Sequence, residues 1–338
     1  MNTYLTRRTV ILLSLVFACA CIAQDVAPPT PPSFGKSGEA IFSTVVALKH
    51  PKKSEDRAEG GTNHIFFTLW IPDGVKAVRG IHLTPFNLDT VEKQQSRAFA
   101  RHWGFAIVGG NFMRVQRDDF APALLTGLRE LAAKSGHGEI AHAPMILTSM
   151  SAGVGMCVTL AEQLPERVIA CGLACLQIGP ETERTRDVPM MSLFGERDGP
   201  QMELHEALLP KRRAAFDASW AITPQWGRKH EWGLANNLLW PFLDEVIRQR
   251  LPADASPADG PVTLRRYDPA RVWLGDPASW RNRAATIAPL EKYPGDKSAA
   301  CWLPGEHVAR VWQAFAVNKP LVRITSPLPQ GEIGRAHV

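Results

Sequence analysis

The sequence has 338 residues, of which 45% are hydrophobic and 21% are charged, and its formal net charge is +5. This length allows one large α/β domain with a sizeable core plus a smaller part, and the hydrophobic content is that of a soluble globular protein. Arg7 and Arg8 lie in a predicted export signal, and without them 36 basic residues face 33 acidic ones, or +3. This balance argues against a nucleic-acid partner.

Residues 1–23 have the pattern of a signal peptide. Arg7 and Arg8 precede an apolar run over residues 10–17, and small residues follow the run. The run is shorter than the roughly 20 residues that a membrane-spanning helix needs. We therefore expect a secreted or periplasmic protein without stable membrane insertion, exported by the general or the twin-arginine route.

Residues 24–38 are a proline-rich linker, and residues 39–250 alternate between strand and helix patterns. The first two strands and the polar residues between them resemble a hairpin and predict an antiparallel edge. The later alternation predicts a mostly parallel sheet with helices on both faces. The expected strands are 40–48, 64–71, 78–83, 105–108, 145–147, 168–176, 188–194 and 220–223, and the expected helices are 91–103, 121–133 and 241–251.

Residues 251–331 are predicted to form a C-terminal extension, because the composition changes to proline, alanine and aspartate after residue 251. Residues 320–327 are similar to the first strand of an immunoglobulin-like module, so the extension could include the start of a truncated β module. Residues 332–338 match the translation of a sequencing-library adapter, and we interpret them as an artefact. The expected elements of the extension are strands at 262–267 and 271–274 and a helix at 306–317.

The stretch from residue 144 to residue 155, Pro-Met-Ile-Leu-Thr-Ser-Met-Ser-Ala-Gly-Val-Gly, carries the first sign of chemistry. An apolar strand runs into Ser151, and the glycines after it open a helical pattern. A strand that turns sharply into a helix at a serine is typical of a nucleophile elbow, which needs small residues two positions away on either side. Ser149 and Gly153 fill these places, whereas a nucleophile at Ser149 would be flanked by Leu147, which is too large.

A serine nucleophile needs a base and an orienting acid, which should follow later strands in the order serine, acid, histidine. The strand at 188–194 ends in Gly-Glu-Arg-Asp-Gly, which makes Asp198 the candidate acid and Glu196 its rival. The strand at 220–223 runs into a loop that contains His230, the candidate base. Ser151, Asp198 and His230 thus follow one another in the expected order.

With these motifs, residues 39–250 resemble an α/β hydrolase, closest to the compact dienelactone hydrolase-like and secreted esterase branches. The resemblance implies a Ser151, Asp198 and His230 triad and a G-x-x-D acid motif at Gly195 and Asp198. It also implies an oxyanion hole, of which one donor is the backbone N–H of Ala152.

The second oxyanion donor should come from the turn at residues 84–87, Thr-Pro-Phe-Asn, which departs from the His-Gly common in the family. Proline has no N–H, so Phe86 is the preferred donor and Thr84 the second choice. An apolar platform for an acyl group or a sugar could be formed by Trp226, Trp232 and Phe86. Simple packing is the alternative for these three side chains.

No cofactor and no metal are expected. His230 and Glu231 lack the second histidine of a zinc protease motif. His82 is predicted to be a satisfied core histidine. Cys19 and Cys21 would leave with the signal unless one is lipidated, and no disulfide or zinc spacing is evident among Cys157, Cys171, Cys175 and Cys301. Cys171 and Cys175 are expected to be small buried hydrophobes.

The sequence therefore predicts an exported serine esterase that acts on a small or polymer-borne ester. A serine peptidase of the same fold and a non-catalytic secreted binding protein are the alternatives, because fold alone does not imply activity.

Overall fold

The computed structural model describes residues 29–30, 32–34, 40–49, 63–113, 115–176, 183–282 and 284–317. The helices and strands of the described residues all lie in one unit. The predictions for the export signal, for most of the polar connector before residue 63 and for residues 318–338 lie outside the described residues.

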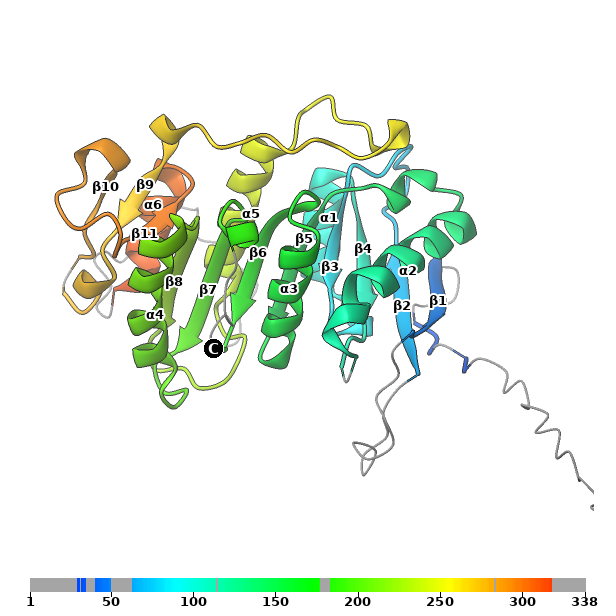
Figure 1. Ribbon diagram of the computed structural model, residues 1–338, viewed down its shortest axis with the longest axis horizontal. Helices are drawn as coiled ribbons and strands as arrows, with labels where there is room; N and C mark the ends of the chain where they lie inside the picture. Colours follow the sequence, from blue (N-terminus) through cyan, green and yellow to red (C-terminus); the bar gives the residue numbers. More distant parts are fainter. Residues whose placement is uncertain are drawn as a thin grey trace, which may run out of the picture. The chain divides into compact units, whose positions relative to one another are not determined.

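An eight-stranded sheet forms the centre of this unit, in the order β1-β2-β4-β3-β5-β6-β7-β8 (Figure 1). Strand β2 runs antiparallel to β1 and β4, and all other neighbours are parallel. This is the mostly parallel α/β-hydrolase sheet that the sequence predicts, with the expected antiparallel edge. The strands are β1 (Ile41–Ala47), β2 (His64–Trp70), β3 (Gly80–Thr84), β4 (Phe105–Gly110), β5 (Met145–Met150), β6 (Val168–Ala174), β7 (Met190–Gly195) and β8 (Trp220–Gln225).

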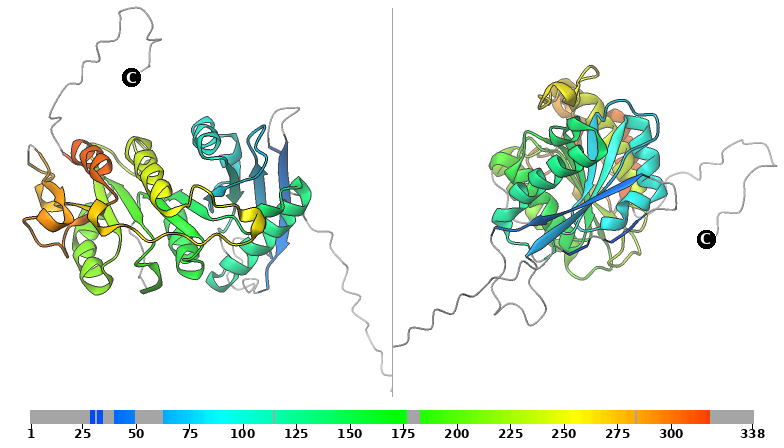
Figure 2. Two further views of the ribbon diagram at one scale, coloured as in Figure 1. Left: turned by 90° about the horizontal axis from the view of Figure 1, so that it is seen from above. Right: turned by 90° about the vertical axis from the view of Figure 1, so that its right-hand side faces the viewer.

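Helices cover both faces of the sheet, as Figures 1 and 2 show. Helices α2, α3 and α4 lie on one face, and α1 and α5 lie on the other. The strands they cover are apolar on both sides, and almost every residue of β3 to β8 is buried. The helices are α1 (Gln94–Trp103), α2 (Phe120–Ser135), α3 (Ala152–Gln163), α4 (Gln201–Phe216) and α5 (Asn236–Arg250).

The residues after α5 form a second, three-stranded sheet and one further helix. The sheet has the order β10-β9-β11 and packs with the helix against β8. The indole Nε1 of Trp312 donates to the carbonyl oxygen of Ile222 at 2.9 Å, which joins this part to the central sheet. Its elements are β9 (Trp273–Gly275), β10 (Ile287–Pro289), β11 (Cys301–Leu303) and α6 (Glu306–Ala316).

Three predicted elements differ from the observed ones. Residues 262–267 are not a strand, because the segment pairs with no neighbouring strand in the described chain and only Arg265 N–H bonds the carbonyl of Arg250. Helix α5 begins five residues before Pro241, which was expected near the helix start. The helix predicted at 91–103 is divided by Lys93 into a 3-10 helix, η2 (Leu88–Glu92), and α1.

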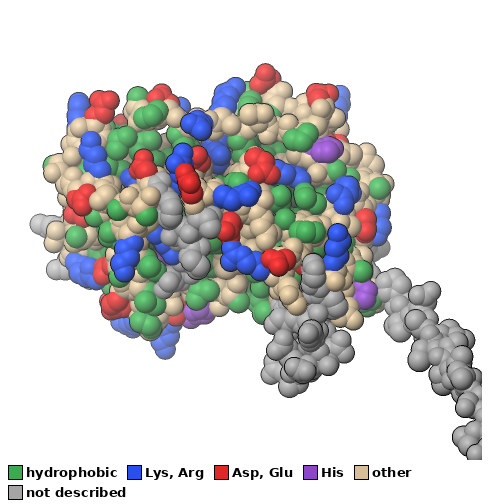
Figure 3. All heavy atoms as spheres, viewed as in Figure 1, with side chains coloured by type: hydrophobic (Ala, Val, Ile, Leu, Met, Phe, Trp, Pro, Cys, Tyr) green, Lys and Arg blue, Asp and Glu red, His purple; other side chains and the backbone are tan. Residues whose placement is uncertain are grey.

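The surface carries charges of both signs. On the face drawn in Figure 3, acidic and basic side chains are interspersed. Ion pairs within single helices include Arg248 with Asp244 at 2.8 Å on α5 and Arg310 with Glu306 at 2.6 Å on α6. No helix among the described residues is both long and apolar enough to cross a membrane.

Candidate functional site

Ser151 stands at the junction of β5 and α3 in a strained backbone conformation. Its φ is 55° and its ψ is −132°, a combination that costs a non-glycine residue of order 1–3 kcal/mol. Two backbone bonds hold it there. The N–H of Ser151 donates to the carbonyl of Ala174 on β6, and the carbonyl of Ser151 accepts from Val154, both at 2.9 Å. The sharp turn predicted at Ser151 is therefore present.

The small residues on either side of Ser151 touch each other. A Cβ atom added to Gly153 would lie 1.9 Å from the hydroxyl oxygen of Ser149 and 3.0 Å from the Cβ of Phe86. Only glycine fits at position 153, and a serine at position 149 still leaves room for the crossing of strand and helix. The same contact places Phe86, from the turn after β3, against the elbow.

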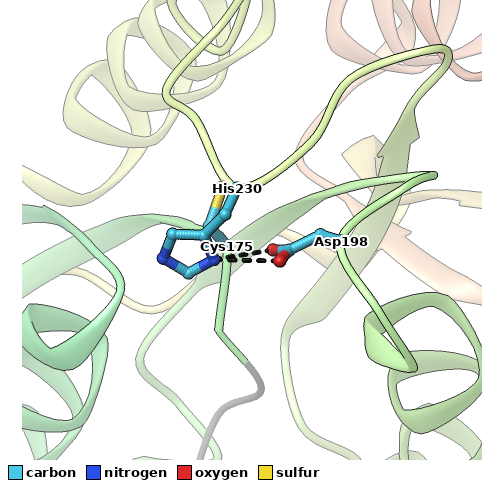
Figure 4. A group of neighbouring side chains, drawn as sticks. All are labelled: Cys175, Asp198 and His230. Atoms are coloured by element: carbon cyan, nitrogen blue, oxygen red, sulfur yellow. Dashed lines mark hydrogen bonds and ion pairs between the residues drawn. The ribbon is translucent and has the colours of Figure 1, made fainter.

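Asp198 and His230 follow the carboxyl ends of the neighbouring strands β7 and β8 and face each other (Figure 4). The Nδ1 atom of His230 lies 3.0 Å from Oδ1 and 2.9 Å from Oδ2 of Asp198. Since an ionised carboxylate only accepts, Nδ1 carries the proton, and Nε2 is free to act as a base. The side chain of Asp198 is 12% exposed and that of His230 is 43% exposed, so the pair is partly accessible to solvent at the carboxyl edge of the sheet.

The loops that carry these two residues are bonded to each other. The N–H of Arg197 donates to the carbonyl of Arg228 at 2.8 Å. A Cβ atom at Gly195 would lie 2.2 Å from the carbonyl oxygen of Lys229, so the loop of His230 passes directly over this glycine. Glu196, the rival acid, accepts from the N–H of Gly227 at 2.7 Å and stabilises the turn, which leaves Asp198 as the carboxylate at the histidine.

The hydroxyl of Ser151 is not hydrogen-bonded to the proposed base. Within the described chain it forms no hydrogen bond with His230 or with any other residue. Bonds between a nucleophile and its base are often long in enzymes without substrate. The structure thus brings Asp198 and His230 into contact and places Ser151 on the elbow, two strands away from β7 in the sheet.

The backbone N–H groups of the two predicted oxyanion donors have no hydrogen-bond acceptor in the described chain. Ala152 is the first residue of α3, and Phe86 lies in the turn after β3. Neither N–H donates to an acceptor in the part of the chain that the structure describes. Thr84, the second choice, is the last residue of β3 and pairs with Gly109 on β4, which makes it the less available donor.

Cys175 is a residue of this edge whose position the sequence analysis missed. It follows β6, has a φ of 62° and is buried, and its Sγ donates to the carbonyl oxygen of Glu231 at 2.9 Å. Burial, and then the charge of Asp198, raise the pKa of Cys175 to about 11, so the group is a neutral thiol at pH 7. The sequence signal was its place directly after a buried parallel strand.

Cys175, Asp198 and His230 also offer three metal-ligating atoms within 4.8 Å of one another. In the described residues these atoms are engaged with protein partners, because His230 bonds Asp198 and Cys175 bonds Glu231. A thiol in this state must lose its proton before it can bind a metal. The four cysteines of the described chain, Cys157, Cys171, Cys175 and Cys301, are all free and buried.

A cavity of about 190 Å³ opens beside the elbow, on the face covered by α1 and α5. His82 lines it, and its Nε2 lies 2.7 Å from the hydroxyl of Thr148, but its buried Nδ1 has no partner in the described chain. The prediction of a satisfied core histidine is therefore wrong for one of its two nitrogens. Burial, with a smaller effect from Lys93, lowers the pKa of His82 to about 4 and keeps the ring neutral. Trp232 lines the cavity too, whereas Trp226 bonds Ala316 on α6.

No protein-family model and no curated protein matches this chain. Several solved structures are similar to it. A cold-adapted esterase from an Arctic intertidal metagenomic library shares 10% identity at a TM-score of 0.46, over 64% of this chain and 96% of the esterase. An S-formylglutathione hydrolase from Agrobacterium tumefaciens shares 13% identity at a TM-score of 0.43, over 67% and 99% of the two chains.

A thermostable esterase shares 15% identity at a TM-score of 0.39, over 55% of this chain and 54% of the esterase, so the chain spans about half the length of that relative. The fold itself rests on the chain's own sheet, in which β3 to β8 are parallel and helices cover both faces. The chain has the α/β-hydrolase fold.

Proposed function

We propose that this chain is a serine hydrolase that cleaves a carboxylic ester through a covalent acyl-enzyme. The observation that carries the proposal is the backbone of Ser151, held at a φ of 55° and a ψ of −132° where β5 turns into α3. Strain of this kind in a non-glycine residue persists only where the surrounding structure holds it, and it concentrates at functional sites. The bonded pair of Asp198 and His230 at the same sheet edge adds a base and its orienting acid.

The proposed reaction uses the chain's own groups and no cofactor. The Nε2 of His230 takes the proton of the Ser151 hydroxyl as its oxygen attacks the ester carbonyl. The N–H groups of Ala152 and Phe86 stabilise the negative charge of the tetrahedral intermediate. His230 then returns the proton to the departing alcohol, and Asp198 holds the imidazole in the required tautomer. A water molecule then attacks the acyl-enzyme, with His230 again as the base, and this step releases the carboxylic acid and regenerates the Ser151 hydroxyl.

Labelling by a fluorophosphonate probe tests this proposal. The wild-type protein is expected to form a stable adduct, Ser151→Ala is expected to form none, and Ser149→Ala is expected to keep the label. Equal labelling of wild type and Ser151→Ala would refute the assignment. The absence of a label on a folded wild-type protein would favour the alternative of a non-catalytic binding protein.

We also propose that the protein is exported. The support is the pattern of Arg7 and Arg8 followed by the apolar run of residues 10–17. Fractionation of cells that express the full chain with a C-terminal tag tests this, since an exported chain is recovered outside the cytoplasm by either route. Replacement of Arg7 and Arg8 by lysine distinguishes the routes, because a twin-arginine signal loses function and a general signal keeps it. Recovery of the chain in the cytoplasm alone contradicts export.

A further inference from the structure

The cavity beside the elbow is lined by residues that are close in sequence to Ser151, His230 and Phe86, although these three do not line it themselves. Thr84 and Asn87 belong to the oxyanion turn, Met150 precedes Ser151, and Trp232 lies two residues after His230; all four line the cavity. Its volume of about 190 Å³ is below the roughly 300–1,000 Å³ of pockets for drug-sized ligands and slightly above the ~150 Å³ that holds a benzene ring. The space is therefore suited to one ring-sized group.

Polar groups without protein partners surround this space. Thr84, Thr90 and Ser96 line the cavity and are 5%, 2% and 7% exposed. In the described chain no hydrogen bond of these three hydroxyls is found, and two further lining atoms, Nδ1 of His82 and Oγ of Ser149, are buried without a partner. Burial of a polar group without a partner is unfavourable, so whatever fills the cavity must itself form hydrogen bonds. An aliphatic acyl chain would leave these groups unsatisfied.

Two tryptophans provide apolar surface in the same cavity, and both are held in place. The Nε1 of Trp232 donates to Oδ1 of Asn236 at 2.9 Å, and the amide of Asn236 bonds Gln95 in turn. Trp240 stacks on Phe99, with ring centroids 4.6 Å apart. Rigid aromatic faces combined with hydroxyl and amide groups match a ring that has apolar C–H faces and hydroxyl edges.

The charge of the cavity favours an uncharged ligand. Among the described residues that line it, Lys93 alone has a permanent charge, and its Nζ lies 3.7 Å from a carboxylate oxygen of Asp89. His82 is neutral above about pH 4. A carboxylate or phosphate entering the cavity would meet no unpaired cation there, whereas a neutral polyol needs none.

We propose that this cavity binds a neutral monosaccharide unit, so that the ester cleaved at Ser151 is one carried by a sugar. The catalytic part of this statement rests on the proposed function, and the binding part does not. Thr90 and Ser96 are the specificity residues to test, because they lie on η2 and α1 and stand outside the proposed reacting groups.

Thr90→Val and Ser96→Ala remove one hydroxyl each. The expected result is a fall of about tenfold in kcat/KM for acetylated methyl glucosides and xylosides, since a hydrogen bond to a buried group is worth roughly 1–2 kcal/mol, while p-nitrophenyl acetate changes less than about twofold. Thr159→Val on α3 is the matched control, a buried threonine that is 7% exposed, as Ser96 is, and lies outside the cavity lining. It is expected to leave both substrates unaffected.

Two results would overturn the proposal. An equal loss on both substrates would make the hydroxyls structural supports of the elbow. A gain on p-nitrophenyl butyrate in Thr90→Val, with sugar acetates unchanged, would make the cavity an acyl pocket.

Calorimetric titration of the protein with methyl glucoside and methyl xyloside separates this inference from the proposed function. If the wild type cleaves no ester but binds a glycoside more tightly than Thr90→Val does, the sugar subsite stands and the hydrolase proposal fails. If ester hydrolysis is normal and neither glycoside binds at millimolar concentration, the subsite fails alone.

Discussion

The thiol of Cys175 donates a hydrogen bond of 2.9 Å to the carbonyl oxygen of Glu231, the residue that follows His230. A side chain at the end of β6 thus holds the loop after β8, across the intervening strand β7. Because the thiol bonds the backbone of the loop that carries His230, we expect Cys175 to position His230 in the proposed reaction.

Replacement of Cys175 by alanine is therefore expected to lower kcat for p-nitrophenyl acetate by about three- to tenfold with little change in KM, since a loosened base impairs proton transfer more than binding. Cys175→Ser keeps a donor and should stay closer to the wild type. Steady-state kinetics, with the Tm of each variant measured in parallel, check this. A Cys175→Ala enzyme with wild-type kcat would show that the bond has no part in catalysis.

Asp198 and Glu196 stand two residues apart in the same loop but have different partners, His230 and the N–H of Gly227. Asp198→Asn is expected to reduce kcat by about 10³- to 10⁴-fold, because an amide at this place favours the wrong histidine tautomer. Glu196→Gln keeps an acceptor for Gly227 and should lose less than about tenfold. The kcat of both variants is the measurement, and the reverse order of the two losses would move the acid to Glu196.

The elbow could be predicted from sequence because its rule is local: Ser149, Ser151 and Gly153 lie within five residues and meet in the structure as their spacing requires. Asp198 and His230 were predictable because parallel strands bring their carboxyl ends to one edge of the sheet. The same edge includes Cys175, which the sequence analysis assigned only to the core. A buried strand end does not itself indicate which distant loop it meets.

The cavity could not be predicted, because Thr90, Ser96 and Trp240 are separated along the chain and converge only when α1 and α5 pack on the same face. Helix α4 was not among the predicted elements. Its hydrophobic pattern is weak, and Pro210 lies inside it. Residues 262–265 alternate between half-buried and exposed positions like a strand, but alternation does not show whether a partner strand exists.

His205 on α4 is expected to make stability depend on pH. The residue is 3% exposed, its Nδ1 donates to the carbonyl of Gln201 at 2.7 Å, and its Nε2 accepts from Ser192 at 3.0 Å. Burial lowers the pKa of His205 from 6.5 to about 4. The unfolded chain therefore binds a proton near pH 6.5 while the folded chain does not, so this contribution is complete above pH 6.5 and is lost as the pH falls towards 4.

The free energy of unfolding should thus fall between pH 7 and pH 4, and His205 can account for up to about 3 kcal/mol of that fall. Urea denaturation at several pH values measures it. His205→Gln is expected to be less stable at pH 7 but to show a shallower decline with acidification. Parallel curves for the variant and the wild type would mean that other groups cause the dependence.

Gly195 is the position where the loop of His230 depends most directly on a missing side chain. The carbonyl oxygens of Lys229 and Arg228 lie 2.2 Å and 2.6 Å from the place that a Cβ would take, and a backbone cannot yield as a flexible side chain can. Gly195→Ala is expected to displace His230 and to reduce kcat/KM for p-nitrophenyl acetate by about 100-fold, the effect of a misplacement near 1 Å.

Gly155→Ala on α3 is the control, since nothing lies within 4 Å of its added Cβ. Alanine there should stabilise the helix by about 0.5–1 kcal/mol and leave the rate unchanged. Equal rates in Gly195→Ala and Gly155→Ala would show that the position of His230 does not depend on this contact.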